Sequence, residues 1–374
     1  MLDVKNVFIL YSRYYDFEES RYEIGGVETY IRNLCRVIGS MGLRPSVIYP
    51  AKENMQKENL SSGETAYGVK CSAGKIKPLV LKAYELGDVE EDILIFATST
   101  LVTKTRFRHV VGIQHGIYWD VDSIHGKKVS GSWSSLLLRM IQAKQQLDLH
   151  RLVNTMVCVD LNYVNWMRSL TVANKLSYTY IPNFAEVAEG GKRTGKDTID
   201  LVFARRFEEI RGCGLLIEVL PPILSSNSTL KLTVAGGGSM EPQLRRAFSG
   251  NNQVSFASYD AADSIAFHSR FDIAIVPTVA SEGTSLSLLE AMSAGCAVIA
   301  TDVGGMSNIL LDGFNGLQIE PTADALKQAI ELLVSDEELR NRLSECARNT
   351  ISSSFSHDVW ASKWQHVIQS LLGE

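Results

Sequence analysis

Two glutamates in the segment 277–321 have side chains and a spacing suited to binding hydroxyl groups. Glu282 precedes a run with helical spacing, Leu286–Ala294, and Glu290 lies inside that run, with seven residues between the two. At ~1.5 Å rise per residue such a spacing spans about 12 Å if fully helical, comparable to a sugar plus a diphosphate. A carboxylate accepts two hydrogen bonds from neighbouring hydroxyls, so we expect Glu290 to bind a ribose diol and Glu282 a second sugar. The alternative is that both are solvated glutamates beside an amphipathic helix.

The start of that helix has the features of a phosphate site. Thr284 and Ser285 are favourable N-cap residues, Leu286 opens the helical run, and Gly295 ends it in a left-handed conformation. Free amide groups and the positive end of the helix dipole attract anions, and an open α/β sheet binds its ligands after a strand end. We therefore expect the residues from Gly283 to Leu286 to contact a phosphate.

These residues belong to a longer series of motifs in which the chain resembles family 4 of the retaining glycosyltransferases. The motifs are Glu282-Gly283-Thr284-Ser285-Leu286, Glu290-Ala291-Met292, Ala294-Gly295, Asp302-Val303-Gly304-Gly305 and Asp312-Gly313-Phe314-Asn315-Gly316. The resemblance implies the GT-B fold, in which two Rossmann-like domains face each other across a cleft. It spans most of the chain, densely after about Pro182 and sparsely before it.

The resemblance also implies two cations for the donor diphosphate. In the family a Gly-Arg pair is followed a few residues later by a Lys-Gly pair; here Arg206 aligns with the arginine and Arg211 with the lysine, while Arg205 replaces the glycine. Two guanidinium groups can neutralise a diphosphate through bidentate hydrogen bonds, although arginine is broader than lysine. The alternative is that these arginines are solvated at a strand end.

Glycine motifs in both halves match the family as well. Gly25 and Gly26 open a helix expected over Val27–Ser40 and resemble the family's N-terminal glycine loop. Glycine there permits close approach of the backbone to a phosphate or sugar. Gly237, within a run of three glycines, resembles the turn beneath the nucleotide, although any tight turn requires glycine.

His115 follows the strand expected over Val110–Gln114 and matches the family's N-domain histidine. The resemblance implies that it orients the donor sugar or the acceptor, without acting as a nucleophile. The alternative is a structural histidine.

Two other patterns point elsewhere. Asp120-Val121-Asp122 spells the Asp-x-Asp string with which other, single-Rossmann glycosyltransferases hold a divalent metal. We expect no metal here, because the arginines and the helix dipole already meet the diphosphate charge. The stretch from Lys127 to Met140 combines cations with apolar residues, a pattern that fits either a helix lying on a membrane surface or a helix facing the core.

Apolar, β-branched runs alternate with helical patterns in both halves, which predicts βαβ units and mostly parallel sheets. We therefore expect an α/β fold of two Rossmann-like domains. The expected strands are 7–11, 45–49, 93–97, 110–114 and 156–159 in the first half, and 199–204, 231–235, 253–256, 273–277 and 297–301 in the second.

The order of these elements suggests the domain boundaries. Residues 1–185 form an acceptor-binding domain, 186–198 a linker rich in glycine and lysine, and 199–356 a nucleotide-sugar-binding domain. Residues 357–374 carry apolar side chains at helical spacing and are expected to cross back to the first domain.

Composition excludes several other classes of protein. Six cysteines never form a CxxC pair, so neither a zinc site nor a redox motif is indicated. No run approaches a signal peptide or a membrane span, and we expect a cytoplasmic location, with peripheral membrane association kept open. Residues 1–190 hold 22 Lys+Arg against 20 Asp+Glu, a balance of +2, which leaves −7 for the remainder of a chain of net charge −5. Without a basic cluster, nucleic acid is not an expected partner.

The predicted function is the transfer of a sugar from a nucleotide diphosphate to an acceptor hydroxyl, with retention, no metal and no further cofactor. The expected acceptor is a carbohydrate or a lipid-linked oligosaccharide in cell-surface or exopolysaccharide assembly. Two alternatives remain: a non-catalytic partner that binds a nucleotide sugar or glycan, and a sugar phosphorylase or synthase of the same fold.

Overall fold

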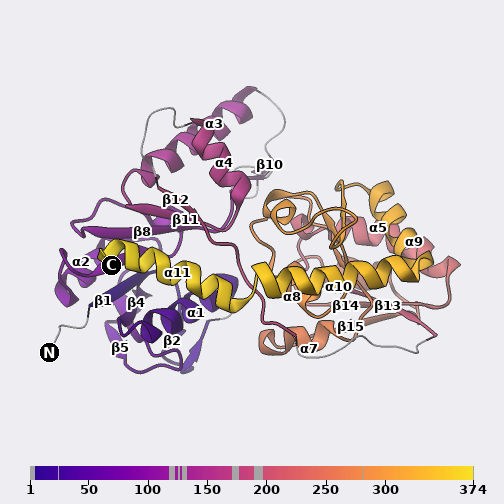
Figure 1. The fold of residues 1–374 in the computed structure, drawn as a ribbon, viewed down its shortest axis with the longest axis horizontal. Helices are drawn as coiled ribbons and strands as arrows, with labels where there is room; N and C mark the ends of the chain where they lie inside the picture. The colour runs from indigo at the N-terminus through magenta and orange to yellow at the C-terminus, as the bar shows by residue number, and fades with distance from the viewer. Residues whose placement is uncertain are drawn as a thin grey trace. The chain divides into compact units, whose positions relative to one another are not determined.

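The computed structural model describes residues 5–23, 25–117, 123–124, 127–128, 133–170, 177–188, 197–280 and 282–373. The chain divides into two compact units (Figure 1). The first unit contains Met1–His115, Asp122–Pro182 and Trp360–Glu374, and the second contains Gly116–Val121 and Asn183–Val359. Most of the predicted linker, residues 189–196, lies outside the described part of the chain.

The first unit is built on an eight-stranded sheet of order β12-β11-β8-β7-β1-β4-β6-β5. All neighbouring pairs are parallel except β5 with β6. Two short hairpins, β2 with β3 and β9 with β10, stand apart from this sheet. The strands are β1 (Asn6–Leu10), β2 (Tyr15–Asp16), β3 (Arg21–Tyr22), β4 (Arg44–Ala51), β5 (Met55–Lys57), β6 (Thr65–Lys70), β7 (Ile93–Phe96), β8 (His109–Gln114), β9 (Ser123–Ile124), β10 (Lys127–Lys128), β11 (Thr155–Cys158) and β12 (Tyr178–Tyr180).

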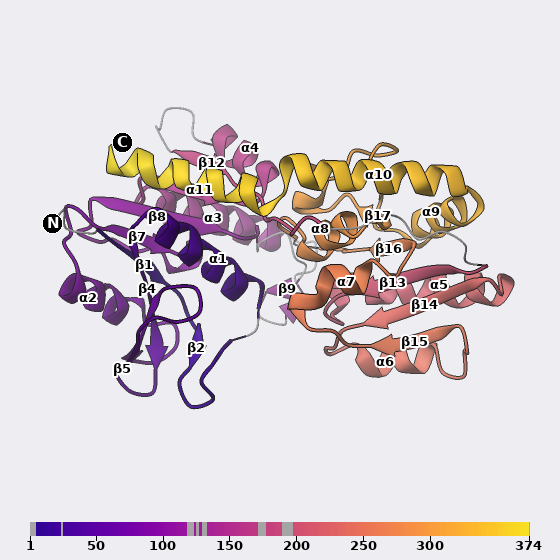
Figure 2. The ribbon, with the colours of Figure 1, turned by 60° about the horizontal axis from the view of Figure 1, so that its bottom comes forward.

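Helices connect and cover these strands. They are α1 (Gly26–Ser40), α2 (Ile76–Leu86), α3 (Trp133–His150), α4 (Leu161–Leu170) and α11 (His357–Leu372), with the short 3₁₀ helix η1 (Ser99–Leu101). The end of the chain belongs to this unit, because α11 runs beside α1 in both ribbon views (Figures 1 and 2). Trp360 and Trp364 are buried, and the Trp364 indole donates a 2.8 Å hydrogen bond to the Tyr30 hydroxyl. The predicted return of the C-terminal helix to the first domain is confirmed.

The second unit has a six-stranded, wholly parallel sheet of order β15-β14-β13-β16-β17-β18. This is the strand order of a doubly wound nucleotide-binding fold, which reverses direction between its first and fourth strands. The strands are β13 (Ile199–Ala204), β14 (Leu230–Ala235), β15 (Val254–Ala257), β16 (Ile273–Val276), β17 (Ala297–Thr301) and β18 (Leu317–Ile319).

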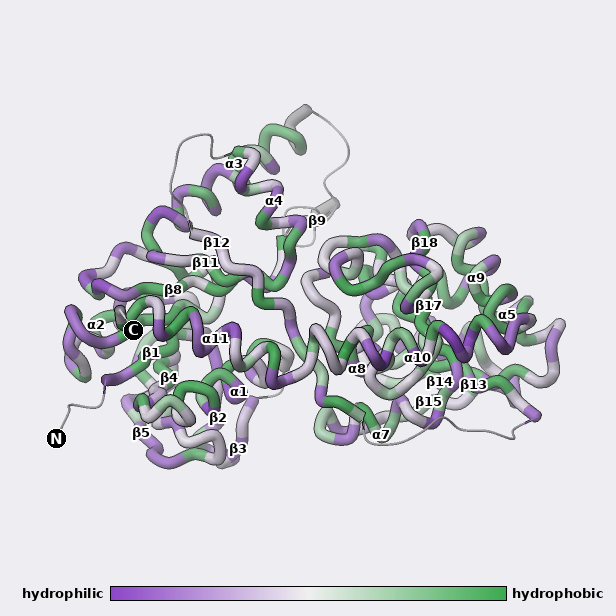
Figure 3. The backbone as a smooth tube through the Cα atoms, viewed as in Figure 1, coloured by the Kyte–Doolittle hydropathy of each residue, from purple (hydrophilic) through white to green (hydrophobic). Residues whose placement is uncertain are grey.

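Alternation along the strands divides the core of this unit into two layers. Leu201 and Phe203 pack on one face of the sheet with α5, α6 and α9, whereas Val202 and Ala204 pack on the other face with α7, α8 and α10. Figure 3 shows the strands as hydrophobic segments between more polar connections. The helices are α5 (Cys213–Ser226), α6 (Glu241–Ala247), α7 (Ser264–His268), α8 (Leu286–Ser293), α9 (Ala323–Ser335) and α10 (Glu337–Ser354), with the 3₁₀ turns η2 (Glu209–Arg211), η3 (Ala261–Asp263) and η4 (Gly304–Asn308).

The predicted α/β class with parallel sheets is confirmed, and every predicted strand is present within a few residues of its expected bounds. Besides the two short hairpins, the strands that the sequence analysis missed lie at or beside the edges of the two large sheets, namely β5, β6, β12 and β18. Edge strands are short or alternate with exposed residues, as β6 does, so they lack the continuous apolar run of a buried parallel strand.

Candidate active site

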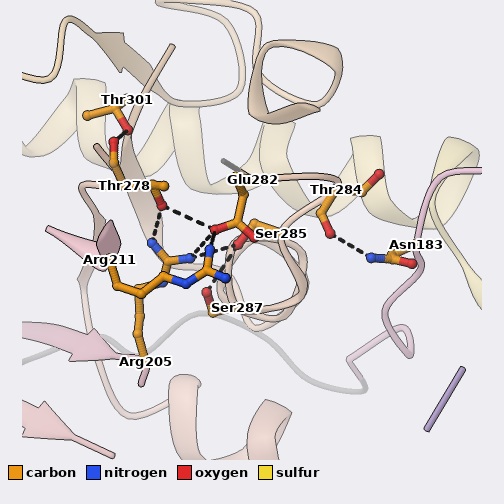
Figure 4. A network of polar contacts seen from close by, with 9 residues as sticks. All are labelled: Asn183, Arg205, Arg211, Thr278, Glu282, Thr284, Ser285, Ser287 and Thr301. Carbon is orange, nitrogen blue, oxygen red and sulfur yellow. Dashed lines mark hydrogen bonds and ion pairs between the residues drawn. The ribbon is translucent and has the colours of Figure 1, made fainter. Parts of the chain in front are cut away.

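A network of polar side chains lies at the carboxyl ends of the two central strands of the second unit (Figure 4). Arg205 directly follows β13, and Thr278 and Glu282 follow β16, which pairs with β13 in parallel. The strand order reverses between these two strands, and such a switch point leaves space for a ligand outside the sheet. The fold therefore brings these side chains to the edge where a doubly wound sheet binds ligands.

Glu282 is the centre of the network. Its Oε2 atom accepts a 2.6 Å hydrogen bond from Arg205 Nη2 and a short one from Arg211 Nη1. The hydroxyl of Thr278 donates to the same oxygen over 3.3 Å and accepts a short hydrogen bond from Arg205 Nη1. Ser285 completes the network, because its hydroxyl accepts from Arg205 Nη2 at 3.4 Å.

The three charged side chains of the network are largely removed from solvent. The exposed fraction is 5% for the Arg205 side chain, 15% for Arg211 and 11% for Glu282. Burial lowers the pKa of Arg205 from its usual value, and the nearby Glu282 carboxylate opposes that shift. Two guanidinium groups share one carboxylate, so the network carries an excess positive charge. A buried excess charge of this kind favours an anionic ligand.

Glycine turns hold the loop that carries Glu282. The Gly305 amide donates a 3.0 Å hydrogen bond to the Glu282 carbonyl. Gly304 has φ +57°, and a Cβ at this position would lie 2.1 Å from the same carbonyl oxygen. Gly212, next to Arg211, has φ +85° and would place a Cβ 1.9 Å from the carbonyl oxygen of Pro277. No side chain fits at either place without displacing the backbone that supports the network.

The glycine turn of residues 236–238 supports Arg205 in the same way. A Cβ at Gly236, where φ is +137°, would lie 2.0 Å from the Arg205 carbonyl oxygen. The Gly237 carbonyl accepts a 2.8 Å hydrogen bond from the Phe207 amide. The contact of Gly237 with a nucleotide stays a prediction. In the structure, its carbonyl helps to fix the segment that follows β13.

The start of α8 differs in one respect from the expectation. Ser285 occupies the N-cap position, but its side chain makes no capping hydrogen bond and is instead bonded to Arg205 and, at 3.2 Å, to Ser287. Asn183 donates a 2.6 Å hydrogen bond to the Thr284 carbonyl and so holds the preceding turn. Gly295 follows the helix with φ +84°, as predicted.

Glu290 is partly buried on the second turn of α8. Its Oε2 atom accepts a 2.6 Å hydrogen bond from the hydroxyl of Ser264. Burial raises the pKa of Glu290 to about 7, and the hydrogen bond from Ser264 reduces that shift. Burial raises the pKa of Tyr259 to about 12, and the negative charge of the Glu290 carboxylate adds to this shift. Glu290 therefore changes its charge near neutral pH.

His115 lies in the first unit, directly after β8. Its Nε2 atom donates a 2.9 Å hydrogen bond to the Ala97 carbonyl, and its ring meets the Tyr30 ring edge-on at 5.1 Å between centroids. Burial lowers the pKa of His115 to about 4, so the ring is neutral at physiological pH. With Nε2 protonated, Nδ1 is the acceptor and can receive a hydrogen bond from a hydroxyl.

The glycine loop of the first unit lies beside a buried carboxylate, Glu28, that pairs with the exposed Arg13. Gly25 stands at the N-cap of α1, and a Cβ there would lie 2.1 Å from Oε2 of Glu28. The side chain of Glu28 is 2% exposed and pairs with Arg13 at 2.7 Å. Glycine at position 25 thus leaves room for this carboxylate. Donor binding by Gly25 and Gly26 stays a prediction.

The structure brings three of the predicted site residues of the second unit into one network. Arg211, Glu282 and Ser285 meet in the network, and Arg205 also bonds Glu282 there, whereas the assignment of Arg206 to the donor diphosphate stays a prediction. The side chain of Arg206 is exposed. Of the two arginines, only Arg205 turns its side chain to the loop that follows β16. The Asp120-Val121-Asp122 string lies outside the described residues.

Thr278 was missed by the sequence analysis, and Arg205 was recorded only as a replaced glycine. A signal for both was present, because each is a polar residue placed within two positions of the end of a central apolar strand. The carboxyl ends of parallel neighbours meet at one edge, so polar residues at both ends are expected to approach each other.

The second unit matches a known family. Residues 188–350 match the model of the family described as Glycosyl transferases group 1. This region contains Glu282, both arginines that bond it, and Glu290.

Curated relatives resemble parts of the chain. The lipopolysaccharide 1,2-N-acetylglucosaminetransferase of Salmonella typhimurium is 27% identical over 188 residues, which cover 47% of this chain and 49% of the relative. An uncharacterized glycosyltransferase of Methanocaldococcus jannaschii is 24% identical over 77% of this chain and 78% of its own. The phosphatidyl-myo-inositol mannosyltransferase of Mycobacterium leprae is 31% identical over 41% of each chain. The matched region thus spans about half or less of the first and third of these relatives.

Solved structures resemble the chain along its whole length. Sucrose-phosphate synthase from Thermosynechococcus elongatus has a TM-score of 0.78 at 14% identity and covers 99% of both chains. HepE of Anabaena in complex with UDP has a TM-score of 0.74 at 15% identity, covering 98% of this chain and 100% of its own. At such identities the likeness is one of fold, and these neighbours have the GT-B fold.

The substitution Gly304→Ala tests the support of the network. We expect a loss of stability above the ~1–2 kcal/mol that a left-handed conformation costs a non-glycine residue, because the added Cβ also collides with the Glu282 carbonyl. Gly313→Ala is the matched control: Gly313 has φ +69° but nothing within 4 Å of an added Cβ. Urea unfolding of both variants measures the difference, and equal losses would contradict this role of Gly304.

The pKa of Glu290 predicts a pH dependence of stability. Between its ordinary value of 4.5 and about 7, the folded protein holds a proton that the unfolded chain has released, so stability falls as pH rises through this window. Glu290→Gln removes the effect and should stabilise the protein at pH 8, by on the order of 2–3 kcal/mol, but hardly at pH 5.

Unfolding at both pH values checks this expectation, with the exposed Glu218 of α5 as control. The same gain from Glu290→Gln at pH 5 and pH 8 would show that the carboxylate does not titrate in this range.

Proposed function

We propose that this protein is a retaining glycosyltransferase, similar to family 4, that moves a sugar from a nucleoside diphosphate to an acceptor hydroxyl. The observation that carries the proposal is the network in which two largely buried guanidinium groups share the single Glu282 carboxylate just before α8. A diphosphate supplies the negative charge that this network lacks. The family match of residues 188–350 supports the same reaction class.

The arginines act on the leaving group in this mechanism. As the bond between the sugar and the diphosphate breaks, its electron pair passes to the diphosphate oxygen, and Arg205 and Arg211 stabilise the new charge. The amides at the start of α8 add to this field, since Ser285 does not cap them. Preorganised charge of this kind is the largest rate term in many enzymes, and it needs no metal ion. The acceptor hydroxyl attacks the sugar carbon from the face that the diphosphate leaves, and its proton passes to the departing diphosphate oxygen.

Glu282 has two parts to play. Without a donor it pairs with both Arg205 and Arg211 and thus stands where a phosphate oxygen would bind. When a donor arrives, its phosphate oxygens replace the carboxylate on the guanidinium groups, and the freed carboxylate accepts hydroxyls of the transferred sugar. A nucleoside diphosphate without sugar offers no such hydroxyls, so Glu282 opposes the binding of the spent product.

Glu290 and His115 are assigned to the binding of hydroxyl groups on the donor or the acceptor. Glu290 binds the ribose diol, and in its ionised form above pH 7 it accepts two hydrogen bonds. His115 is neutral and keeps Nδ1 as an acceptor, so it orients a hydroxyl of the sugar or the acceptor without acting as a nucleophile.

The acceptor is proposed to be a carbohydrate or a lipid-linked oligosaccharide in cell-surface glycan assembly at the cytoplasmic face of a membrane. The names of two relatives, a lipopolysaccharide N-acetylglucosaminetransferase and a phosphatidyl-myo-inositol mannosyltransferase, support this class of acceptor.

A thermal-shift screen with UDP, GDP and ADP sugars tests the function. A donor at about 100 times its Kd should stabilise the protein by ~2.7 kcal/mol. Arg205→Ala should lower the rate of transfer or donor hydrolysis by ~10²–10³, the loss typical of one oxyanion-stabilising donor. Arg206→Ala should cost less, because that side chain is exposed.

Three outcomes would change the proposal. A protein that no nucleotide sugar stabilises is not a transferase of this type. Donor binding without transfer or hydrolysis would favour the non-catalytic alternative. If Arg206→Ala lowers the rate more than Arg205→Ala does, Arg206 is the arginine that binds the diphosphate.

The exchange at Glu282 predicts an unusual effect of one substitution. Glu282→Gln should bind the bare nucleoside diphosphate about tenfold more tightly than the wild type, because the competing carboxylate is gone, while transfer of the sugar slows. Titration calorimetry with the diphosphate identified in the screen measures this effect. Glu209→Gln, an exposed position on η2, is the control for a general loss of negative charge. Weaker binding by Glu282→Gln would show that the carboxylate mainly orients the arginines.

A further inference from the structure

A cavity of about 490 Å³ opens on the surface of the second unit, between α10 and the loop that follows η4. This volume lies in the range of ~300–1,000 Å³ that is typical of sites for small ligands. The loop contributes Leu311 and Phe314 to its lining, and α10 contributes Asn349 and Ser353. None of the described residues that line the cavity belongs to the polar network around Glu282, so the cavity is separate from the candidate active site.

Asn315 fixes the wall that the loop forms. It is 1% exposed, and its Oδ1 atom accepts a 2.8 Å hydrogen bond from the Leu311 amide. Its Nδ2 atom donates to the Ile309 carbonyl at 3.0 Å and to the Thr350 hydroxyl on α10 at 3.1 Å. One buried amide therefore shapes the loop and ties it to the helix. Because a buried amide is stable only when it is hydrogen-bonded, the wall has its shape before a ligand binds.

Large apolar side chains of this loop stand exposed at the cavity. Phe314 is 51% exposed and Leu311 is 62% exposed, whereas Ile309 and Phe355, which also line the cavity, are buried. A ligand that covers the Phe314 ring removes apolar surface from water, and the negatively polarised face of the ring attracts C–H groups. The exposed ring is therefore a platform on which the apolar face of a ligand can pack.

The polar part of the lining carries no formal charge. It consists of asparagine, serine, threonine and cysteine side chains, although 21% of the whole chain is charged. Cys346, Thr350 and Ser353 follow one another at three or four residues and so share one side of α10. The Ser353 hydroxyl donates a 2.7 Å hydrogen bond to the Asn349 carbonyl, so its oxygen can accept from a ligand. Such a lining favours a neutral ligand with many hydrogen-bonding groups.

The two properties together select one class of ligand. A sugar ring has a face of C–H groups that packs on an aromatic ring, and a rim of hydroxyls that pair with amides and hydroxyls. A nucleotide, a charged peptide or an anionic lipid would find no partner for its charge among the described lining residues.

We propose that this cavity binds a neutral carbohydrate, with one sugar ring stacked on Phe314 and its hydroxyls hydrogen-bonded to Asn349 and Ser353. The site is additional to the proposed reaction centre, and its occupation requires neither a donor nor a transfer step. The protein thereby has a second place, on the second unit, at which it holds a glycan.

Saturation-transfer NMR of the full chain with maltose, cellobiose and diacetylchitobiose tests the proposal. These neutral disaccharides differ in linkage and substituents, and at least one of them should bind the wild type. Phe314→Ala should weaken that binding at least about tenfold, because the stacked ring is gone. Phe314→Leu should weaken it similarly, since leucine is apolar but has no ring face, whereas Phe314→Trp should retain it.

Leu332→Ala on α9 is the matched control, because Leu332 is 44% exposed in the same unit and does not line the cavity. It should bind the disaccharide as the wild type does. The unfolding midpoint of the Phe314 and Leu332 variants should remain unchanged, since both side chains are exposed. Binding should also persist in Arg205→Ala, which alters the proposed reaction centre and leaves the cavity intact.

Three results would overturn the proposal. The first is that none of the disaccharides binds the wild type. The second is undiminished binding by Phe314→Ala or Phe314→Leu. The third is binding that is lost in Arg205→Ala but kept in Phe314→Ala, which would place the sugar at the reaction centre. Light scattering that shows dimers of the wild type and monomers of Phe314→Ala would also overturn it and assign this surface to a second copy of the chain.

Discussion

A single carboxylate oxygen, Oε2 of Glu282, holds two guanidinium groups inside the second unit, and the geometry of the candidate active site depends on that contact. Charges removed from water are tolerated only when they are paired and hydrogen-bonded. Arg205 comes from the end of β13, Arg211 from η2 and Glu282 from the loop after β16, so the contact also ties three separate segments together. Since one anion cannot balance two cations, the same contact that stabilises the empty site prepares it for a diphosphate.

Backbone turns at glycine residues fix the positions of these charges. Gly212, Gly236 and Gly304 each adopt a left-handed or otherwise restricted conformation, and each lies against a carbonyl of the segments that carry the network. These glycines therefore allow two backbone segments to pack closely against each other, whether or not they also contact a ligand. In the first unit Gly25 plays a comparable part, by leaving room for the buried carboxylate of Glu28.

Much of the fold followed from local sequence pattern, and the exceptions have a common cause. Central strands such as β13 and β17 are buried on both faces, so their apolar runs are continuous and their bounds were predicted to the residue. Strands β6 and β18 lie towards the sheet edges, where burial is partial and the pattern is weak. The motif around Glu282 located the site along the chain, but the alignment singled out Arg206 for the diphosphate and did not predict that Arg205 bonds Glu282. Which of two adjacent arginines turns inward depends on the pleat of β13 relative to β16, and no local pattern contains that information.

The sequence by itself determined the α/β class, the order of the βαβ elements and the segments that hold the chemistry, because these depend on local periodicity and on short motifs. Only the tertiary structure decided which side chains meet. Arg205 and Glu282 are far apart along the chain, and their hydrogen bond exists because β13 and β16 are parallel neighbours in the sheet. The raised pKa of Glu290 and the exposure of Phe314 were decided in the same way, since burial is a property of the packed chain and not of any residue type.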